Sequence, residues 1–192
     1  MSILCDTSSI LMLFPVAPEM FVDRTFDCIT IKDVHDELIQ TQKFRTKYPW
    51  IRTCRPKLRI RFLNAAEKER EILFYKTVGC LCQAKLNKLT GKMFHLSPED
   101  KKVISHTLAI GASISTGDNN ISRFMKQEFP KDYGGELSAL EVVISWIERG
   151  LITWTQEKQA VLEDWARNDE PVQPHLAKNR FRALTGLDYI GP

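Results

Sequence analysis

The chain has 192 residues, of which 43% are hydrophobic and 27% charged, a balance typical of a soluble globular protein with a substantial core. It has no apolar run long enough to cross a bilayer, and Asp6 interrupts the apolar residues near its start. We therefore expect neither a membrane span nor a signal peptide. The five cysteines lack the paired spacing of a zinc site, which favours reduced thiols in a cytoplasmic protein.

The first part of the chain predicts two strands, each followed by a helix. Residues 2–5 are a short apolar strand that ends at Asp6, and hydroxyl residues that can cap a helix follow it. Residues 28–31 look like a second strand. Residues 33–40 then have the apolar spacing of a helix, and Glu37 lies on that helix.

The next segment, residues 38–66, is strongly basic although the net charge of the whole chain is only +3. It contains eight Lys and Arg residues and no Asp or Glu, together with Tyr48, Trp50 and prolines that argue against one continuous helix. We expect its cations to contact phosphates and its aromatic rings to stack on unpaired bases. An acidic protein partner would fit the same charge pattern. The candidate nucleic-acid-binding residues are Lys43, Arg45, Lys47, Trp50, Arg52, Arg55 and Arg59.

Residues 90–125 have the clearest local pattern in the chain. Ser97 is a good N-cap, Pro98 suits the first helical position, and Asp100 lies in the first turn of a helix that Gly111 ends. Residues 112–116 are short and apolar, as a buried parallel strand should be, and Asp118 follows directly.

Helices dominate the remaining predictions. Asn64 should cap a long helix to about Leu89, with Gly79 as a possible break. After residue 130 the sequence predicts a loop, a helix over 137–149, an extended piece over 151–154, a helix from Thr155 to about Arg167, and a proline-containing tail with a small apolar cluster.

Acidic residues thus follow strands or open helices at four places, Asp6, Glu37, Asp100 and Asp118. Because the carboxyl ends of parallel strands share one crevice, we expect these carboxylates to meet there. Such oxygen ligands suit Mg²⁺ or Mn²⁺, and a cation would relieve their mutual repulsion. Each acid alone also has a structural explanation: Asp100 favours a helix N-terminus through the helix dipole, and Asp118 can cap the next helix.

This arrangement resembles the PIN-domain family. Residues 6–8 resemble its opening strand end and first acid, Glu37 between apolar residues resembles its second signature, and residues 96–100 with 116–118 resemble its third. The family often has a further polar or acidic residue where Asn120 stands. The resemblance covers about residues 1–130.

The resemblance implies an α/β, three-layer α/β/α domain with a central parallel sheet over residues 1–130, including a basic insert at 43–61. Residues 131–192 would be a helical C-terminal extension packed on the same domain. The implied function is a ribonuclease that hydrolyses RNA phosphodiesters with carboxylate-bound Mg²⁺ or Mn²⁺. By family analogy it would be the toxin of a toxin–antitoxin pair, with an antitoxin as inhibitor and a homodimer as a further option. The implied catalytic residues are Asp6, Glu37, Asp100 and Asp118, the metal ligands Asp6, Asp100 and Asp118, and the supporting residues Thr7, Ser8, Thr116 and Asn120.

Two other functions stay open from the sequence. A catalytically silent nucleic-acid-binding module could keep the same fold; the four acids favour the enzyme, whereas Asn120 is the feature that points the other way. A DNA-directed flap nuclease would need more acids than the pattern assigns to the site.

Overall fold

The computed structural model describes residues 2–54 and 57–192. Four short parallel strands form the central sheet in the order β2-β1-β3-β4. They are β1 (Ile3–Cys5), β2 (Cys28–Ile29), β3 (Ser113–Ser115) and β4 (Glu136–Leu137). In the centre, Leu4 lies opposite Ile114 on β3 and Ile29 on β2, and all three side chains are fully buried. The predicted α/β class with a parallel sheet is confirmed.

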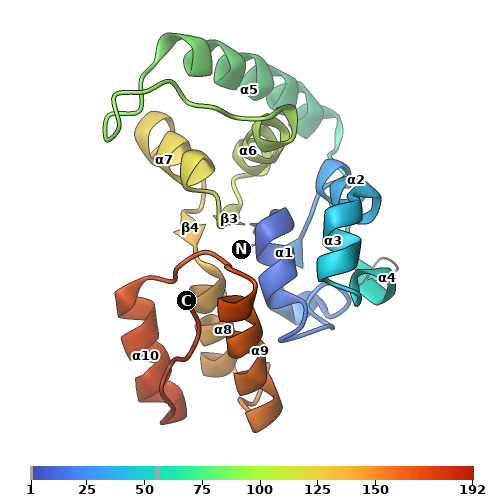
Figure 1. Ribbon diagram of the computed structural model, residues 1–192. Coiled ribbons are helices and arrows are strands. Elements are labelled where there is room, and N and C mark those ends of the chain that lie inside the picture. Colours follow the sequence, from blue (N-terminus) through green and yellow to red (C-terminus); the bar gives the residue numbers. More distant parts are fainter. Residues whose placement is uncertain (1, 55–56) are drawn as a thin grey trace.

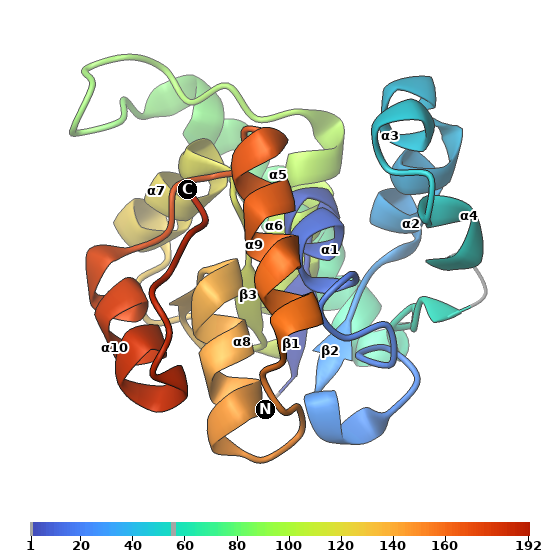
Figure 2. The same cartoon turned by 60° about the horizontal axis from the view of Figure 1, so that its bottom comes forward.

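Helices cover both faces of the sheet (Figure 1). The first face carries α5 (Ala65–Ala84), α6 (Pro98–Ile110) and α7 (Asn119–Glu128). The second face carries α1 (Thr7–Leu13), α8 (Ala139–Glu148) and α9 (Gln156–Arg167), and α10 (His175–Thr185) packs beside α8. Figure 2 shows α8 and α9 in front of the strands and α10 to their left. Beyond the β2 edge lie α2 (Lys32–Gln40), α3 (Gln42–Lys47) and α4 (Ile51–Cys54), and a short 3₁₀ helix spans Arg24–Phe26.

Local chemistry explains where the predicted helices begin and end. The Asn64 side chain accepts from the Glu67 amide at 2.9 Å and opens α5, and Ser97 does the same for Asp100 at 3.0 Å in α6. Two expectations for α5 were wrong: Gly79 lies inside the helix, which ends at Ala84 rather than near Leu89. The backbone becomes extended at Lys85, and a turn follows in which the side chain and carbonyl of Asn87 accept backbone bonds.

The C-terminal part contributes to the sheet as well as adding helices. Leu137, predicted to begin a helix, lies in β4, which pairs with β3. The helix begins two residues later because Ser138 caps it and forms a reciprocal pair with Glu141. The segment predicted as a helical C-terminal extension therefore also supplies the edge strand. Over residues 2–54 and 57–192, no helix is long and apolar enough to span a membrane.

Gly117, two residues after β3, is where the C-terminal segment touches the sheet edge. A Cβ at this position would lie 2.4 Å from Pro171 Cγ and 2.9 Å from Ser8 Oγ, so only glycine fits without a shift. The loop between α9 and α10 is thereby packed directly on the turn that leads to Asp118.

This packing predicts the effect of two matched substitutions. Gly117→Ala should lower the free energy of unfolding by about 1–3 kcal/mol, because the added methyl overpacks the contact with Pro171. Gly79→Ala should instead raise it by about 0.5–1 kcal/mol, since no atom lies within 4 Å of the new Cβ and alanine is the better helix former. Urea unfolding measures both; equal effects of the two substitutions would contradict the close contact at Gly117.

Candidate active site

The candidate site lies at the carboxyl ends of β1 and β3. These two strands are neighbours, yet the chain goes from β1 to β2 on one side and returns to β3 on the other. Such a reversal in strand order opens a crevice in a parallel sheet. A cavity of about 300 Å³ lies here, and we call it the acidic cavity.

The acidic cavity brings together most of the predicted site residues, which come from three separated parts of the chain. All four predicted catalytic acids line it, as do two supporting hydroxyl residues and two lysines of the basic segment. These residues are Asp6, Thr7, Ser8, Glu37, Lys43, Lys47, Asp100 and Asp118. All four predicted acids therefore line one cavity.

Asp6 is the most constrained of these acids. It is 6% exposed; its Oδ1 accepts from the Ser9 amide and the Ser8 hydroxyl, each at 2.8 Å, and its Oδ2 accepts from the Thr116 hydroxyl at 2.5 Å. Burial raises the pKa of Asp6 to about 6, although these hydrogen bonds oppose the shift. Among the described residues, no Lys or Arg forms a salt bridge with this carboxylate.

The other three acids are also held by hydrogen bonds. Glu37 accepts a short hydrogen bond from the Thr7 hydroxyl, which fixes it against the start of α1. Asp118 caps α7 by accepting from the Asn120 amide at 2.6 Å. The Asp100 pKa is raised by burial and, to a smaller extent, by the negative charges of Asp118 and Glu99, whereas bonds from Ser97 oppose the shift.

Three further acids line the same cavity, although no sequence pattern indicated them as site residues. Glu99 precedes Asp100 in the first turn of α6, whereas Asp169 and Glu170 come from the loop after α9. Nothing in the local sequence around Asp169 and Glu170 marks them as site residues. Asp169 is exposed and has a positive φ of 52°, a conformation that few non-glycine residues adopt.

The basic segment is divided by the fold. Lys43 and Lys47 reach the acidic cavity, whereas Arg45, Arg52 and Arg59 are not among its lining residues, and Arg55 lies outside the described residues. The expectation that Tyr48 offers a free stacking face was wrong, because its ring is buried and its hydroxyl donates to Glu170. Trp50 is partly buried and stacks on Phe14 with a ring-centroid distance of 5.2 Å.

The two remaining supporting residues have structural contacts. Thr116 bonds Asp6 through its hydroxyl and also accepts from the Asp118 amide at 3.0 Å, so it links two of the predicted acids. Asn120 does not line the cavity; only its backbone amide contributes, by bonding Asp118.

The acidic cavity contains oxygen donors that suit a metal ion, but the described residues do not form a complete set of metal ligands. Within the described part of the chain, no three His, Cys, Asp or Glu side chains lie together as a ready metal-binding group. Asp6, Asp100 and Asp118 line one cavity, yet their predicted sharing of one cation stays a prediction.

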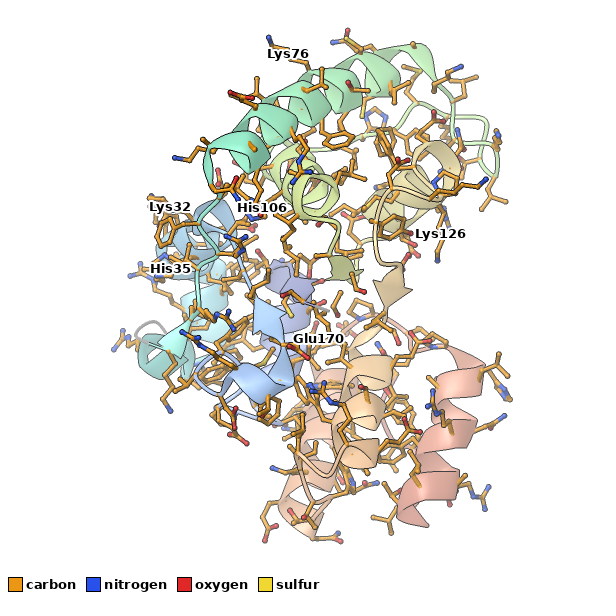
Figure 3. The ribbon with its side chains drawn as sticks, turned by 180° about the vertical axis from the view of Figure 1, so that it is seen from behind. Lys32, His35, Lys76, His106, Lys126 and Glu170 are labelled. Atoms are coloured by element: carbon orange, nitrogen blue, oxygen red, sulfur yellow. The ribbon has the colours of Figure 1, made fainter. Side chains whose placement is uncertain are left out.

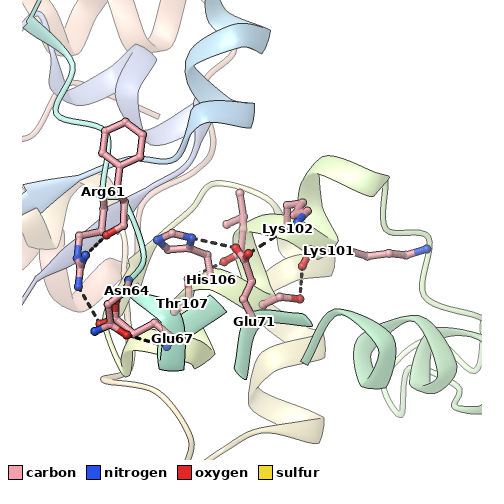
Figure 4. Close-up of polar contacts among 11 residues, drawn as sticks. Arg61, Asn64, Glu67, Glu71, Lys101, Lys102, His106 and Thr107 are labelled. Atoms are coloured by element: carbon pink, nitrogen blue, oxygen red, sulfur yellow. Dashed lines mark hydrogen bonds and ion pairs between the residues drawn. The ribbon is translucent and has the colours of Figure 1, made fainter. Parts of the chain in front are cut away.

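A second polar cluster joins α5 to α6 and lies apart from the site, since His106 is far from Glu170 in Figure 3. His106 Nδ1 lies 3.0 Å from Glu71 Oε1, and Arg61 pairs with Glu67 at 2.8 Å (Figure 4). Burial lowers the pKa of His106, which is 4% exposed. We assign this cluster to packing between the two helices.

Comparisons with known proteins add no assignment to this geometry. No family model matches the chain, and neither a curated protein nor a solved structure matches it.

The burial of Asp6 predicts a pH-dependent cost to stability. Its folded pKa of about 6 exceeds the ordinary value of 3.8, so the folded state keeps the proton longer as pH rises. Stability should therefore fall between about pH 4 and pH 6 and stay reduced above that range. Asp6→Asn removes this charge. The free energy of unfolding of the variant minus that of the parent should therefore increase by up to about 3 kcal/mol from pH 4 to pH 7.

The measurement is urea unfolding in EDTA across this pH range. Asp132→Asn serves as the control, because Asp132 is exposed and outside the cavity. A constant difference between Asp6→Asn and the parent at every pH would contradict the burial of a charged Asp6.

Proposed function

We propose that this chain is a metal-dependent endoribonuclease of the PIN type, which hydrolyses RNA phosphodiester bonds in the acidic cavity. The observation that supports this best is the meeting of Asp6, Glu37, Asp100 and Asp118 at the crevice between β1 and β3. A need for packing alone would not bring four carboxylates from separate segments to one cavity, because their charges repel each other.

The donor chemistry fits Mg²⁺ or Mn²⁺. In the part of the chain that the structure describes, none of the four carboxylates forms a salt bridge with Lys or Arg. Asp6, Asp100 and Asp118 would hold the cation, with Glu37 directly beside them or bonded through water. A bound divalent cation would supply positive charge to the phosphate and lower the pKa of its water.

The neighbouring side chains fix the acids in position. Hydroxyls of Ser8 and Thr116 and the Ser9 amide hold both oxygens of Asp6, so this carboxylate cannot turn freely. The hydroxyl of Thr7 holds Glu37 in the same way. Such preorganisation lowers the cost of arranging charges during the reaction.

Lysines at the cavity wall would receive the RNA. Lys43 is exposed and lines the cavity, and Lys47 lines it while donating to the Asn168 carbonyl. Positive side chains beside the carboxylates would draw the phosphate backbone to an otherwise repulsive site. RNA is therefore the partner that we propose, whereas an antitoxin or a second copy of the chain rests on family analogy alone.

Substituting Asp118 tests the nuclease proposal. Asp118→Asn should reduce RNA cleavage by about 10²-fold or more, because one ligand loses its charge. The fold should remain, since asparagine caps a helix as well as aspartate does and can keep the bond to the Asn120 amide. Cleavage of a labelled RNA panel with Mn²⁺, and with EDTA in its place, measures the effect beside the Asp132→Asn control. Equal cleavage by parent and Asp118→Asn would leave the silent binding module as the better function.

Substituting Lys43 tests the RNA path. Lys43→Gln should weaken RNA binding regardless of base sequence and reduce the slope of log affinity against log salt by about 1, because one phosphate contact is lost. Lys131, which is exposed and outside the cavity, gives the control Lys131→Gln. If both variants keep the parent's slope, Lys43 does not touch phosphate.

A further inference from the structure

A loop after α5 carries large apolar side chains on its surface, and we call residues 85–93 the projecting loop. Leu86, Leu89 and Met93 are 52%, 79% and 38% exposed, respectively. In Figures 1 and 2 this segment extends outward from the end of α5, on the side opposite α2, α3 and α4. A single exposed leucine is ordinary, but large apolar side chains gathered on one loop indicate a surface that contacts a partner.

Hydrogen bonds hold the projecting loop in one conformation. The buried Asn87 side chain accepts from the Leu89 amide at 2.9 Å. Gln127 on α7 accepts from the Lys88 amide and donates to the Leu86 carbonyl, each at 2.9 Å. A single antiparallel bridge closes the base of the loop. The apolar side chains are therefore presented to the outside by a fixed backbone.

The charged side chains of the projecting loop are all positive. Lys85, Lys88 and Lys92 are exposed, and none of them forms a salt bridge within the described part of the chain. Each exposed apolar residue of the loop directly follows one of these lysines, and no acidic residue occurs between Glu71 and Glu99. A partner that fits the loop must therefore offer apolar contacts and negative charge side by side.

An anionic membrane surface offers this combination, because its charged headgroups lie directly above the acyl chains. From this match we infer that the projecting loop binds the surface of an anionic lipid bilayer, with Leu89 inserted between headgroups and the lysines bound to their negative charges. Lysine suits this position because its apolar stem lies along the acyl chains while its ammonium group reaches the headgroups. Such binding stays at the bilayer surface and needs no membrane-spanning helix.

Other partners fit the projecting loop less well. Protein interfaces are enriched in arginine and depleted in lysine, whereas every cation between Glu71 and Glu99 is a lysine. Unpaired RNA bases stack on aromatic rings, and residues 85–93 contain no aromatic residue. The loop is also separate from the proposed nuclease site, since none of its residues lines the acidic cavity. The inference therefore does not depend on the proposed function.

Co-sedimentation of the full chain with lipid vesicles tests this inference. The probes are vesicles of phosphatidylcholine alone and vesicles of phosphatidylcholine with about 30% phosphatidylserine. The parent should bind the mixed vesicles at least about tenfold more tightly, because each lysine beside an anionic surface strengthens binding about fivefold. Added salt should weaken this binding, since it screens the lysines.

Two pairs of matched variants separate the apolar and the charged contribution. Leu89→Ser should weaken binding to the mixed vesicles by about tenfold or more, whereas Leu176→Ser, at an 82% exposed leucine on α10, should leave it unchanged. Lys88→Gln should weaken it about fivefold, and Lys57→Gln, at an exposed lysine beyond α4, should have no effect. Thermal unfolding should show that all four variants are folded, because the substituted side chains are exposed.

The inference is overturned if the parent binds neither kind of vesicle, or if Leu89→Ser binds the mixed vesicles as the parent does. A protein with an acidic, apolar groove would then be the better partner for the projecting loop. Equal binding of the parent to both kinds of vesicle would also contradict the inference, since the lysines would not contact headgroups. Because no RNA is present in this assay, its outcome is independent of whether the nuclease proposal succeeds or fails.

Discussion

The hydrogen bonds around Asp6 connect the two central strands at their carboxyl ends, and the rest of the site depends on this connection. Asp6 bonds Thr116 across the crevice, Ser8 accepts from the Gly117 amide at 2.8 Å, and the Ser9 hydroxyl lies 3.0 Å from that of Ser115. Asp6, Ser8 and Ser9, at the start of α1, thus bind the end of β3 and the turn that follows it. Because Thr116 also bonds the Asp118 amide, the same network fixes the second acid.

Bonding of this kind positions a carboxylate without neutralising it. Hydroxyl and amide donors stabilise the charged form of Asp6, yet burial still raises its pKa to about 6. The site therefore carries an electrostatic cost that a bound cation would remove. Unfavourable buried charges of this kind are typical of ligand-binding and catalytic sites. A bound cation would stabilise the charged Asp6, which is the physical basis for the proposed metal-dependent function.

The loop between α9 and α10 completes the site from the far end of the chain. Pro171 packs on Gly117, Glu170 bonds Tyr48, and the Asn168 carbonyl accepts from Lys47. These contacts tie the basic segment to the sheet edge. The basic segment is thus a structural wall of the site as well as a source of positive charge, which explains why Tyr48 is buried although it lies among charged residues.

The sequence by itself determined the local elements and the chemistry at their ends. Asn64 and Ser97 open helices through bonds within one turn, and apolar runs bounded by polar residues mark the central strands, so these features could be read from neighbouring residues. The order of Asp6, Glu37, Asp100 and Asp118 along the chain predicted their meeting, because parallel strands place their carboxyl ends at one edge.

Only the tertiary structure decided which distant segments of the chain reach the sheet and the carboxyl ends of its central strands. The edge strand β4 has two residues, too few for a periodic pattern, and it exists because β3 offers it hydrogen-bonding partners. Asp169 and Glu170 reach the acidic cavity because α9 ends beside it, and Tyr48 is buried because Glu170 accepts its hydroxyl. The β3–β4 pairs join residues that are not neighbours in the sequence, and the bond from Tyr48 to Glu170 joins residues 122 positions apart. No local spacing in the sequence encodes such contacts.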